Sequence, residues 1–336
     1  MVIQFIVFLL GLVVLFFGAE WLVKAASSIA LKFGIRPLII GLTIVALGTS
    51  LPEFLLNVFA LIYNEDDMAV GNIVGSNIAN IGLVLGLSIV LMPIAVNRDV
   101  LKTEYPMMLV VSLLFYGLAA DGILSRADGA LLTLGLLAFL VYVVMNSKVA
   151  GAPSPDDNGG PPRNQGDNEA HDSAEDVSLT TDDLDSSRPK RIMYLVAGSL
   201  GLTVGARLMV SSAVNLAEML HVEPVFIGLT IVAIGTSLPE LAAALVLARK
   251  SQSDMSLGNI FGSNMLNILF VVGIVSFVQP IAVPADAITY HLPVMIAFTV
   301  ALYPLARYGE IMTDSAGFAL LTAFVAYMGW LVFPYL

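Results

Sequence analysis

One 13-residue phrase occurs twice in the chain with a single change. Residues 41–53 read GLTIVALGTSLPE and residues 228–240 read GLTIVAIGTSLPE, so only Leu47 and Ile234 differ. The same shift of 187 positions superposes GNIVGSN at 71–77 on GNIFGSN at 258–264, and PIAV at 93–96 on PIAV at 280–283, without a gap. Because chance does not produce such a match, the chain consists of two homologous halves.

The composition around this repeat is that of a membrane protein. Hydrophobic residues make up 58% of the 336 positions and charged residues only 12%, with a mean hydropathy of +0.89. A membrane-spanning helix needs about 20 apolar residues. We predict ten spans, at residues 2–23, 38–62, 68–92, 104–120, 127–145, 192–217, 225–248, 255–279, 288–306 and 315–334. The first span is not read as a secretory signal, because no Lys or Arg precedes its apolar core.

Five spans in each half determine how the halves are arranged. A second copy that follows an odd number of crossings starts from the opposite side of the membrane, so we predict an all-α polytopic protein with two inverted five-helix repeats. The first repeat covers residues 1–145, with its motif at 41–80, and the second covers 191–336, with its motif at 228–267.

The distribution of Lys and Arg predicts the orientation. Of the 15 Lys and Arg residues, all but Arg126 and Arg207 fall in segments on one predicted side. The positive-inside rule therefore places both termini outside the cytoplasmic membrane and residues 146–190 in the cytoplasm.

Residues 146–190 differ from the rest of the chain. They contain ten acidic and four basic residues among Pro, Gly, Asn and Ser. We predict a disordered acidic linker, with a regulatory cation-binding segment as the functional alternative. The net charge of −11 argues against a nucleic-acid partner, and the absence of cysteine excludes disulfides and thiolate metal ligands.

Each copy of the phrase ends in a glutamate near the middle of a predicted span. An ionised side chain at that depth costs roughly 2.5–3.5 kcal/mol on insertion scales. A protonated carboxyl, or one paired with a buried base, is the alternative to a functional site, but no Lys, Arg or His lies at comparable depth in either half. A bound cation is therefore the natural counter-charge for Glu53 and Glu240.

A proline precedes each glutamate. Pro52 and Pro239 have no backbone N–H, so we expect them to disturb the helix around Ala46–Thr49 and Ala233–Thr236 and to leave carbonyl oxygens without partners. A broken helix is tolerated at membrane depth only where it faces a cavity or other protein. The repeated phrase thus predicts a bent helix beside a cavity.

Hydroxyl and amide side chains surround each glutamate in the sequence. Thr49 and Ser50 share the helix face of Glu53, and the next span adds Asn72, Ser76 and Asn80 at intervals of four. The second half repeats the set with Thr236, Ser237, Glu240, Asn259, Ser263 and Asn267.

These side chains offer only oxygen ligands. Two carboxylates with hydroxyl, amide and carbonyl oxygens suit Ca²⁺, the neutral positions suit Na⁺, and soft transition metals are disfavoured. Helix packing by small residues is the alternative explanation for the Gly-Asn and Ser-Asn pairs, but it does not explain a glutamate repeated near the membrane midplane.

The double motif G-T-S-L-P-E and G-N-x-x-G-S-N-x-x-N resembles the α-repeats of the sodium/calcium exchanger family, in the cation/Ca²⁺ antiporter superfamily, and in particular its prokaryotic members. The resemblance covers both halves and leaves out the linker. Proton-coupled calcium exchangers of the superfamily typically carry an acidic GNxxE pattern where this chain has GNIVGSN and GNIFGSN. Potassium-dependent exchangers carry Asp where this chain has Asn267, so the resemblance implies independence from K⁺.

The resemblance also implies roles for single residues. Glu53 and Glu240 would coordinate Ca²⁺ together with Thr49 and Thr236. The residues implied at the flanking Na⁺ positions are Ser50, Ser76, Ser237 and Ser263, with the carbonyls of Ala46 and Ala233, while Asn80 would occupy the central position. The first and sixth spans would slide against the other eight. We expect Na⁺ and Ca²⁺ as substrates, no cofactor, and no obligate protein partner.

Rival functions use the same carboxylates differently. A Ca²⁺/H⁺ antiporter would use them as proton carriers. An intramembrane hydrolase would use them as acid and base, but two glutamates in identical surroundings do not suit that division of labour. A passive channel fits poorly with inverted repeats and broken midplane helices. We therefore predict a secondary antiporter and no enzyme.

Overall fold

The computed structural model describes residues 1–63, 65–147, 188–220, 233–307 and 311–333. This part is helical apart from two pairs of two-residue strands. The predicted linker lies almost wholly outside it. The elements of the first half are α1 (Val2–Phe33), α2 (Pro37–Ile40), η1 (Gly41–Val45), α3 (Ala46–Thr49), α4 (Leu51–Tyr63), α5 (Asp66–Ala79), η2 (Asn80–Leu85), α6 (Gly86–Leu91), β1 (Ile94–Ala95), α7 (Arg98–Lys102), α8 (Glu104–Ala119), β2 (Ile123–Leu124) and α9 (Arg126–Met145), where η marks a π-helical segment.

The second half repeats this order. Its described elements are α10 (Arg188–Met219), α12 (Ala233–Gly235), α13 (Leu238–Arg249), α14 (Ser253–Leu266), η5 (Asn267–Val272), α15 (Gly273–Val278), β3 (Ile281–Ala282), η6 (Ala287–His291), α16 (Leu292–Arg307), β4 (Ile311–Met312) and α17 (Asp314–Val332). The π-helical segments η2 and η5 begin at the repeat-equivalent Asn80 and Asn267.

Seven described helices are long and apolar enough to cross a membrane, and the pair Pro37–Thr49 and Leu51–Tyr63, bent by 46°, is an eighth if it forms one broken span. Two predicted spans are not among them. Helix α8 has only 16 residues, and residues 225–232 of the span at 225–248 lie outside the described part. The protein is therefore an all-α, multi-pass membrane protein, while the total of ten spans is still a prediction.

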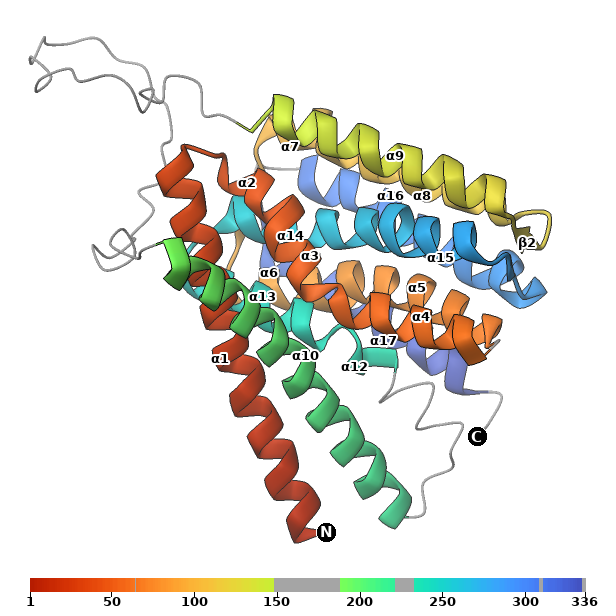
Figure 1. Cartoon of the computed structure of the whole chain (residues 1–336), viewed down its shortest axis with the longest axis horizontal. Coiled ribbons are helices and arrows are strands. Elements are labelled where there is room, and N and C mark those ends of the chain that lie inside the picture. Colours follow the sequence, from red (N-terminus) through yellow and green to blue (C-terminus); the bar gives the residue numbers. More distant parts are fainter. Residues whose placement is uncertain (64, 148–187, 221–232, 308–310, 334–336) are drawn as a thin grey trace, which may run out of the picture.

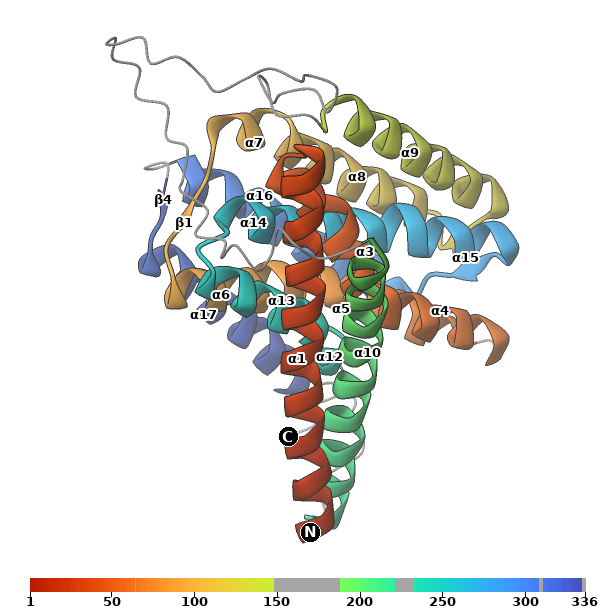
Figure 2. The same ribbon diagram turned by 60° about the vertical axis from the view of Figure 1, so that its left-hand side comes forward.

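The long helices α1 and α10 lie side by side and project from the bundle of the other helices (Figures 1 and 2). A Cβ atom on Gly11 would meet Met209, and one on Gly18 would lie 2.6 Å from the Leu202 backbone nitrogen. Later residues of α1 therefore contact earlier residues of α10. The repeat-equivalent helices therefore run antiparallel, as the predicted inversion requires. Each has 32 residues, or about 48 Å at 1.5 Å per residue, so they must tilt to fit a core of about 30 Å.

Two small sheets join the halves at opposite ends of the bundle (Figures 1 and 2). Strand β1 pairs with β4, and β2 pairs with β3, each in the antiparallel sense. Strands β1 and β3 belong to the repeated PIAV sequence. Each copy of PIAV thus pairs with a strand of the other half.

The two spans that carry the repeated Asn and Ser residues form the centre of the bundle. Buried residues make up 78% of the most apolar stretch of Asp66–Leu91 and 83% of that of Ser253–Val278, against 22–28% for the other five long helices. Because protein surrounds these two spans, their polar side chains face protein and not lipid.

Candidate cation-binding site

Both copies of the repeated phrase break their helix at the serine. The backbone angles are φ −84° and ψ 5° at Ser50, and φ −85° and ψ 4° at Ser237. Pro52 and Pro239 follow two residues later, at the second position of α4 and α13. The predicted interruption of the helix is confirmed at both positions, and a bend of 46° accompanies the first. The interruption follows from prolines that can begin a helix but not continue one.

The glutamate after each break is completely buried. Glu53 and Glu240 both have 0% exposure. The Oε1 and Oε2 atoms of Glu53 and the Oε2 atom of Glu240 accept no hydrogen bond from any described residue. The remaining oxygen, Oε1 of Glu240, accepts a hydrogen bond of 3.1 Å from the Ser50 hydroxyl. This contact joins the first copy of the phrase to the second.

The two carboxylates lack a basic partner. Within the described ranges, no Lys, Arg or His forms an ion pair with either glutamate. Burying an unpaired charge is costly, so these two carboxyl groups are the least favourable buried groups of the repeated phrases unless something neutralises them. The site contains two carboxylates and no larger cluster of acidic or histidine ligands among the described residues.

Helix α14 of the second half covers the break of the first half. The Thr49 hydroxyl donates to Asn259 Oδ1 at 3.4 Å and lies 3.4 Å from the Ser263 hydroxyl. All three side chains are at most 1% exposed. The predicted group of Thr49, Asn259 and Ser263 is therefore brought together from the two halves.

The prediction that the Ala46 carbonyl oxygen lacks a hydrogen-bond partner is wrong. This oxygen accepts the backbone N–H of Ser50 at 2.9 Å and the Thr49 hydroxyl at 3.2 Å, so it is not left without a partner. The reason is that helix α3 continues to Thr49 before the chain bends, since the proline lies beyond the bend. Ala233 opens helix α12, and residues 228–232 of the second phrase lie outside the described part.

Amide side chains join the two central spans. The Asn267 Nδ2 atom donates to the Ser76 hydroxyl at 3.1 Å and to Asn77 Oδ1 at 3.5 Å. Asn80 is 0% exposed, and neither polar atom of its amide finds a hydrogen-bond partner among the residues described. Serine and asparagine oxygens from both halves thus lie at the centre of the bundle.

A cavity of about 330 Å³ reaches part of this site. Thr236 and Asn72 line it, together with Gly71, Gly75 and the side chains of four neighbouring elements, including His291 and Tyr327. Ser237 is 1% exposed, and its hydroxyl makes no hydrogen bond within the described part of the chain. The second copy of the phrase therefore borders an open space, whereas Thr49 of the first copy is sealed against α14.

Two asparagines near the site were not nominated from the sequence. Asn77 accepts from Asn267, and Asn57 donates to the backbone oxygen of Glu53 at 2.8 Å. Asn77 directly follows Ser76 in the repeated Gly-Ser-Asn and could have been included on that ground. Asn57 has no such signal, because its repeat-equivalent position holds Ala244.

Comparisons with known proteins agree in covering both halves. A family model described as sodium/calcium exchanger protein matches residues 3–146 and 190–333. The Alkalimonas amylolytica protein that carries the antiporter name CaxA is 40% identical over 334 residues, which cover 97% of this chain and 98% of that protein. The sodium/calcium exchanger MaX1 of Methanosarcina acetivorans is 32% identical over 346 residues, or 97% of each chain.

A solved structure is similar over nearly the whole chain. It is that of the sodium-calcium exchanger NCX_Mj soaked with Na⁺ and Ca²⁺, which superposes with a TM-score of 0.79 at 28% sequence identity and covers 98% of each chain.

Proposed function

This chain belongs to the sodium/calcium exchanger family, and from that premise we propose that it exchanges Na⁺ for Ca²⁺ across a membrane by alternating access. The family consists of transporters, so the ions are substrates. The observation that carries the proposal is the pair of fully buried glutamates, one from each repeat, with three oxygens that accept no hydrogen bond from the described residues.

The donor set supports these two ions. Ca²⁺ binds six to eight oxygen ligands and is neutralised by two carboxylates, which Glu53 and Glu240 supply, with Thr49 and Thr236 beside them. We assign Na⁺ to flanking positions with neutral oxygens. These are Ser50, Ser76, Ser237, Ser263 and the carbonyls of Ala46 and Ala233, with Asn80 in the central position. The buried amide of Asn80, whose oxygen accepts no hydrogen bond from the described residues, is consistent with a ligand there.

Sharing the carboxylates explains exchange without leak. Na⁺ and Ca²⁺ compete for the same two glutamates, so binding one releases the other. An empty site would carry two buried negative charges, which is an unfavourable state for the conformational switch. Only the protein with ions bound would switch between its outward-open and inward-open forms. The inward Na⁺ gradient would then drive Ca²⁺ out of the cell.

We propose that the cavity is the extracellular route to the site. This follows from the predicted orientation in the cytoplasmic membrane, with both termini outside and the acidic linker at 146–190 in the cytoplasm between repeats 1–145 and 191–336. The cavity is lined by the later part of α17, by α5 and by η6, all of which are predicted to lie in the outer half. Helices α1 and α10 would slide against the remaining bundle to close it.

Ca²⁺ uptake into proteoliposomes tests the function. Liposomes loaded with Na⁺ are diluted into Na⁺-free buffer at equal pH on both sides, with wild type and Glu240→Gln. Uptake that requires internal Na⁺ and is lost in the variant is the expected result. Uptake that ignores Na⁺ and follows an imposed pH gradient would replace the proposal with Ca²⁺/H⁺ exchange, and no uptake under either gradient would mean another cation.

The same liposomes test the role of K⁺. Because Asn267 holds the position that is Asp in potassium-dependent exchangers, we expect the same uptake rate when K⁺ is replaced by choline on both sides. A rate that falls to background without K⁺ would overturn this part of the proposal and leave the Na⁺ dependence intact.

A further inference from the structure

The repeat relates two residues that lie in unlike surroundings. Glu104, at the start of α8, is shifted by 187 positions onto His291, at the end of η6. His291 lines the cavity that reaches Thr236 and Asn72. Glu104 is 1% exposed. His291 lies at the open cavity. Because the repeats are inverted, Glu104 occupies the equivalent position on the opposite side of the membrane.

The equivalent helices α5 and α14 also differ in how tightly they are packed. Gly71 and Gly75 of α5 line the cavity. Their repeat equivalents on α14 are packed tightly: a Cβ atom on Gly258 would lie 2.3 Å from the Leu38 carbonyl oxygen, and one on Gly262 would lie 2.5 Å from that of Leu42. The route through the second phrase is therefore open in this structure, and the equivalent route through the first phrase is closed.

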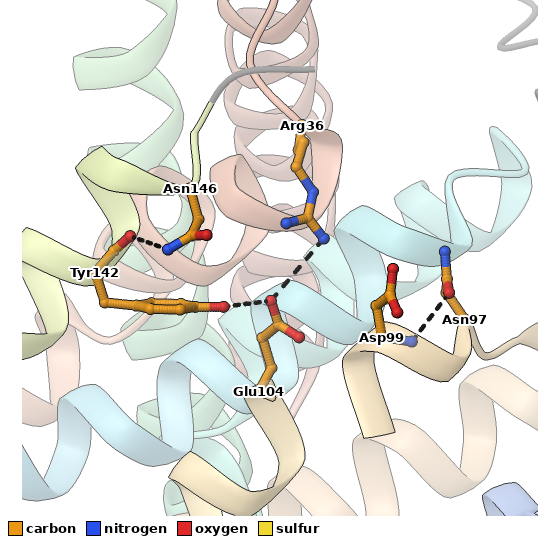
Figure 3. Close-up of polar contacts among 6 residues, drawn as sticks. All are labelled: Arg36, Asn97, Asp99, Glu104, Tyr142 and Asn146. Carbon is orange, nitrogen blue, oxygen red and sulfur yellow. Dashed lines mark hydrogen bonds and ion pairs between the residues drawn. The ribbon is translucent and has the colours of Figure 1, made fainter. Parts of the chain in front are cut away.

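Figure 3 shows three side chains whose polar groups meet around Glu104. The Tyr142 hydroxyl of α9 donates to Glu104 Oε1 at 2.9 Å, and the guanidinium of Arg36 lies 4.0 Å from the same oxygen. The second oxygen of Glu104 is buried and accepts no hydrogen bond from the residues described. We call Arg36, Glu104 and Tyr142 the Glu104 cluster.

Arg36 connects this cluster to the helix that is expected to move. Helix α1 ends at Phe33, Gly34 adopts a left-handed conformation with φ 58°, and α2 begins at Pro37. The Arg36 backbone N–H also donates to the Ser147 carbonyl, just after α9, at 2.9 Å. Arg36 is thus held both to the end of α1 and to the end of α9, and a displacement of α1 along its axis would have to break the bond to Ser147 to move Arg36 away from Glu104.

We propose that the Glu104 cluster holds the inner end of the ion route closed, and that Glu104 lines that route when it opens. The inference rests on the proposed alternating-access function. With the route closed, Arg36 balances the charge of Glu104. With the route open, the separated carboxylate adds a negative charge to the path by which cations reach Glu53 and Glu240 from the cytoplasmic side, and this charge attracts Ca²⁺ more strongly than Na⁺.

A single cysteine reports the opening, since the chain contains none of its own. Val143 of α9 is 7% exposed. The last span of each half is offset by 188 and not 187 positions, because α9 starts at Arg126 and α17 at Asp314, so Val143 corresponds to the cavity-lining Leu331. Val143→Cys is made in the full chain, in inside-out membrane vesicles, and the rate of modification by a membrane-impermeant maleimide is measured.

The labelling rate is compared in three backgrounds. Adding Arg36→Gln is expected to speed modification about 10-fold, since a lost ion pair of about 1.4 kcal/mol shifts a two-state equilibrium by that factor. Lys32→Gln, which removes an exposed basic residue from the end of α1, should leave the rate unchanged. Tyr142→Phe keeps the packing, removes the hydroxyl and should accelerate labelling in the same direction.

Equal rates in Arg36→Gln and Lys32→Gln would overturn the proposal, and so would faster labelling only from the extracellular face.

A second experiment, on transport, addresses Glu104 itself. Glu104→Gln should raise the cytoplasmic Ca²⁺ concentration for half-maximal exchange by about 10-fold, and the exposed Asp99→Asn control should not. If wild-type liposomes show no exchange, the proposed function fails, whereas normal exchange with unaltered labelling and Ca²⁺ dependence rejects the Glu104 cluster alone.

Discussion

The hydrogen bond from Ser50 to Glu240 is the most specific polar contact between the two phrases. It is 3.1 Å long and fully buried, and a bond to a charged acceptor contributes about 1.5–3 kcal/mol. We predict that Ser50→Ala raises the Ca²⁺ concentration for half-maximal exchange by about 10- to 100-fold, at 1.4 kcal/mol per factor of ten. Initial Ca²⁺ uptake rates over a range of Ca²⁺ concentrations give this value.

Ser88 provides the matched control for Ser50. It is also completely buried, but its hydroxyl donates at 2.7 Å to the Val84 carbonyl of its own helical segment. Ser88→Ala should leave the Ca²⁺ dependence unchanged. Equal effects of the two variants would mean that Ser50 serves only the packing of the bundle.

Single residues also mark the limit of what the sequence predicts. The two phrases are nearly identical, so Glu53 and Glu240 were expected to have the same surroundings. In the structure the Glu240 carboxylate accepts a hydrogen bond from Ser50, whereas the Glu53 carboxylate accepts none from the described residues. A pattern of residue types predicts which side chains gather, but hydrogen-bond partners depend on how the two halves are displaced relative to each other.

At the scale of helices, the close packing of α14 on η1 and α3 depends on glycine. A Cβ atom on Gly262 would lie 2.5 Å from the Leu42 carbonyl oxygen and 2.8 Å from the Ala46 Cβ atom. Because backbone must move to admit it, we predict that Gly262→Ala costs about 1–3 kcal/mol by overpacking. The expected result is a lower melting temperature of the purified protein in Na⁺.

The repeat supplies the comparison for this variant. Gly75 is the equivalent of Gly262 but lines the cavity, so Gly75→Ala should lower the melting temperature much less. If both alanines have the same effect, the two ends of the ion route are packed alike in solution, which contradicts the difference between α5 and α14.

The elements themselves were only partly predictable. Pro52 and Pro239 correctly indicated the two helix breaks. The π-helical segments that begin at Asn80 and Asn267 have no comparable signal, because these two spans are buried on most sides and a shift of helical register then leaves no mark in the hydrophobic pattern. The Glu104 cluster was also missed, because Arg36 counted only toward the orientation and Glu104 lies at the edge of a predicted span.

At the scale of the whole molecule, the inverted repeat was predictable and the conformational state was not. An odd number of spans per half implies inversion from the sequence alone. Which route is open cannot follow from it, because Thr49 and Thr236 stand in nearly the same phrase and yet only Thr236 borders the cavity. Alternating access requires two packings of one sequence that differ little in free energy, and a repeat pattern describes both equally.

The arrangement of α1 and α10 leads to a test of how the molecule moves. Trp21 of α1 lies against Tyr194 of α10, with ring centroids 6.5 Å apart, and the adjacent Glu20 forms a 3.5 Å ion pair with Lys250, which follows α13. If α1 and α10 slide together, the first contact is kept during transport and the second must break.

Two double-cysteine variants separate these contacts in a chain that has no native cysteine. We predict that a reducible bis-thiol reagent joining Trp21→Cys to Tyr194→Cys leaves Na⁺-dependent Ca²⁺ uptake largely intact, because both ends belong to the moving pair. The same reagent joining Glu20→Cys to Lys250→Cys should stop uptake, and reduction should restore it. Block by the first cross-link but not by the second would place the moving boundary between α1 and α10, and the sliding of the two helices as one unit would then be wrong.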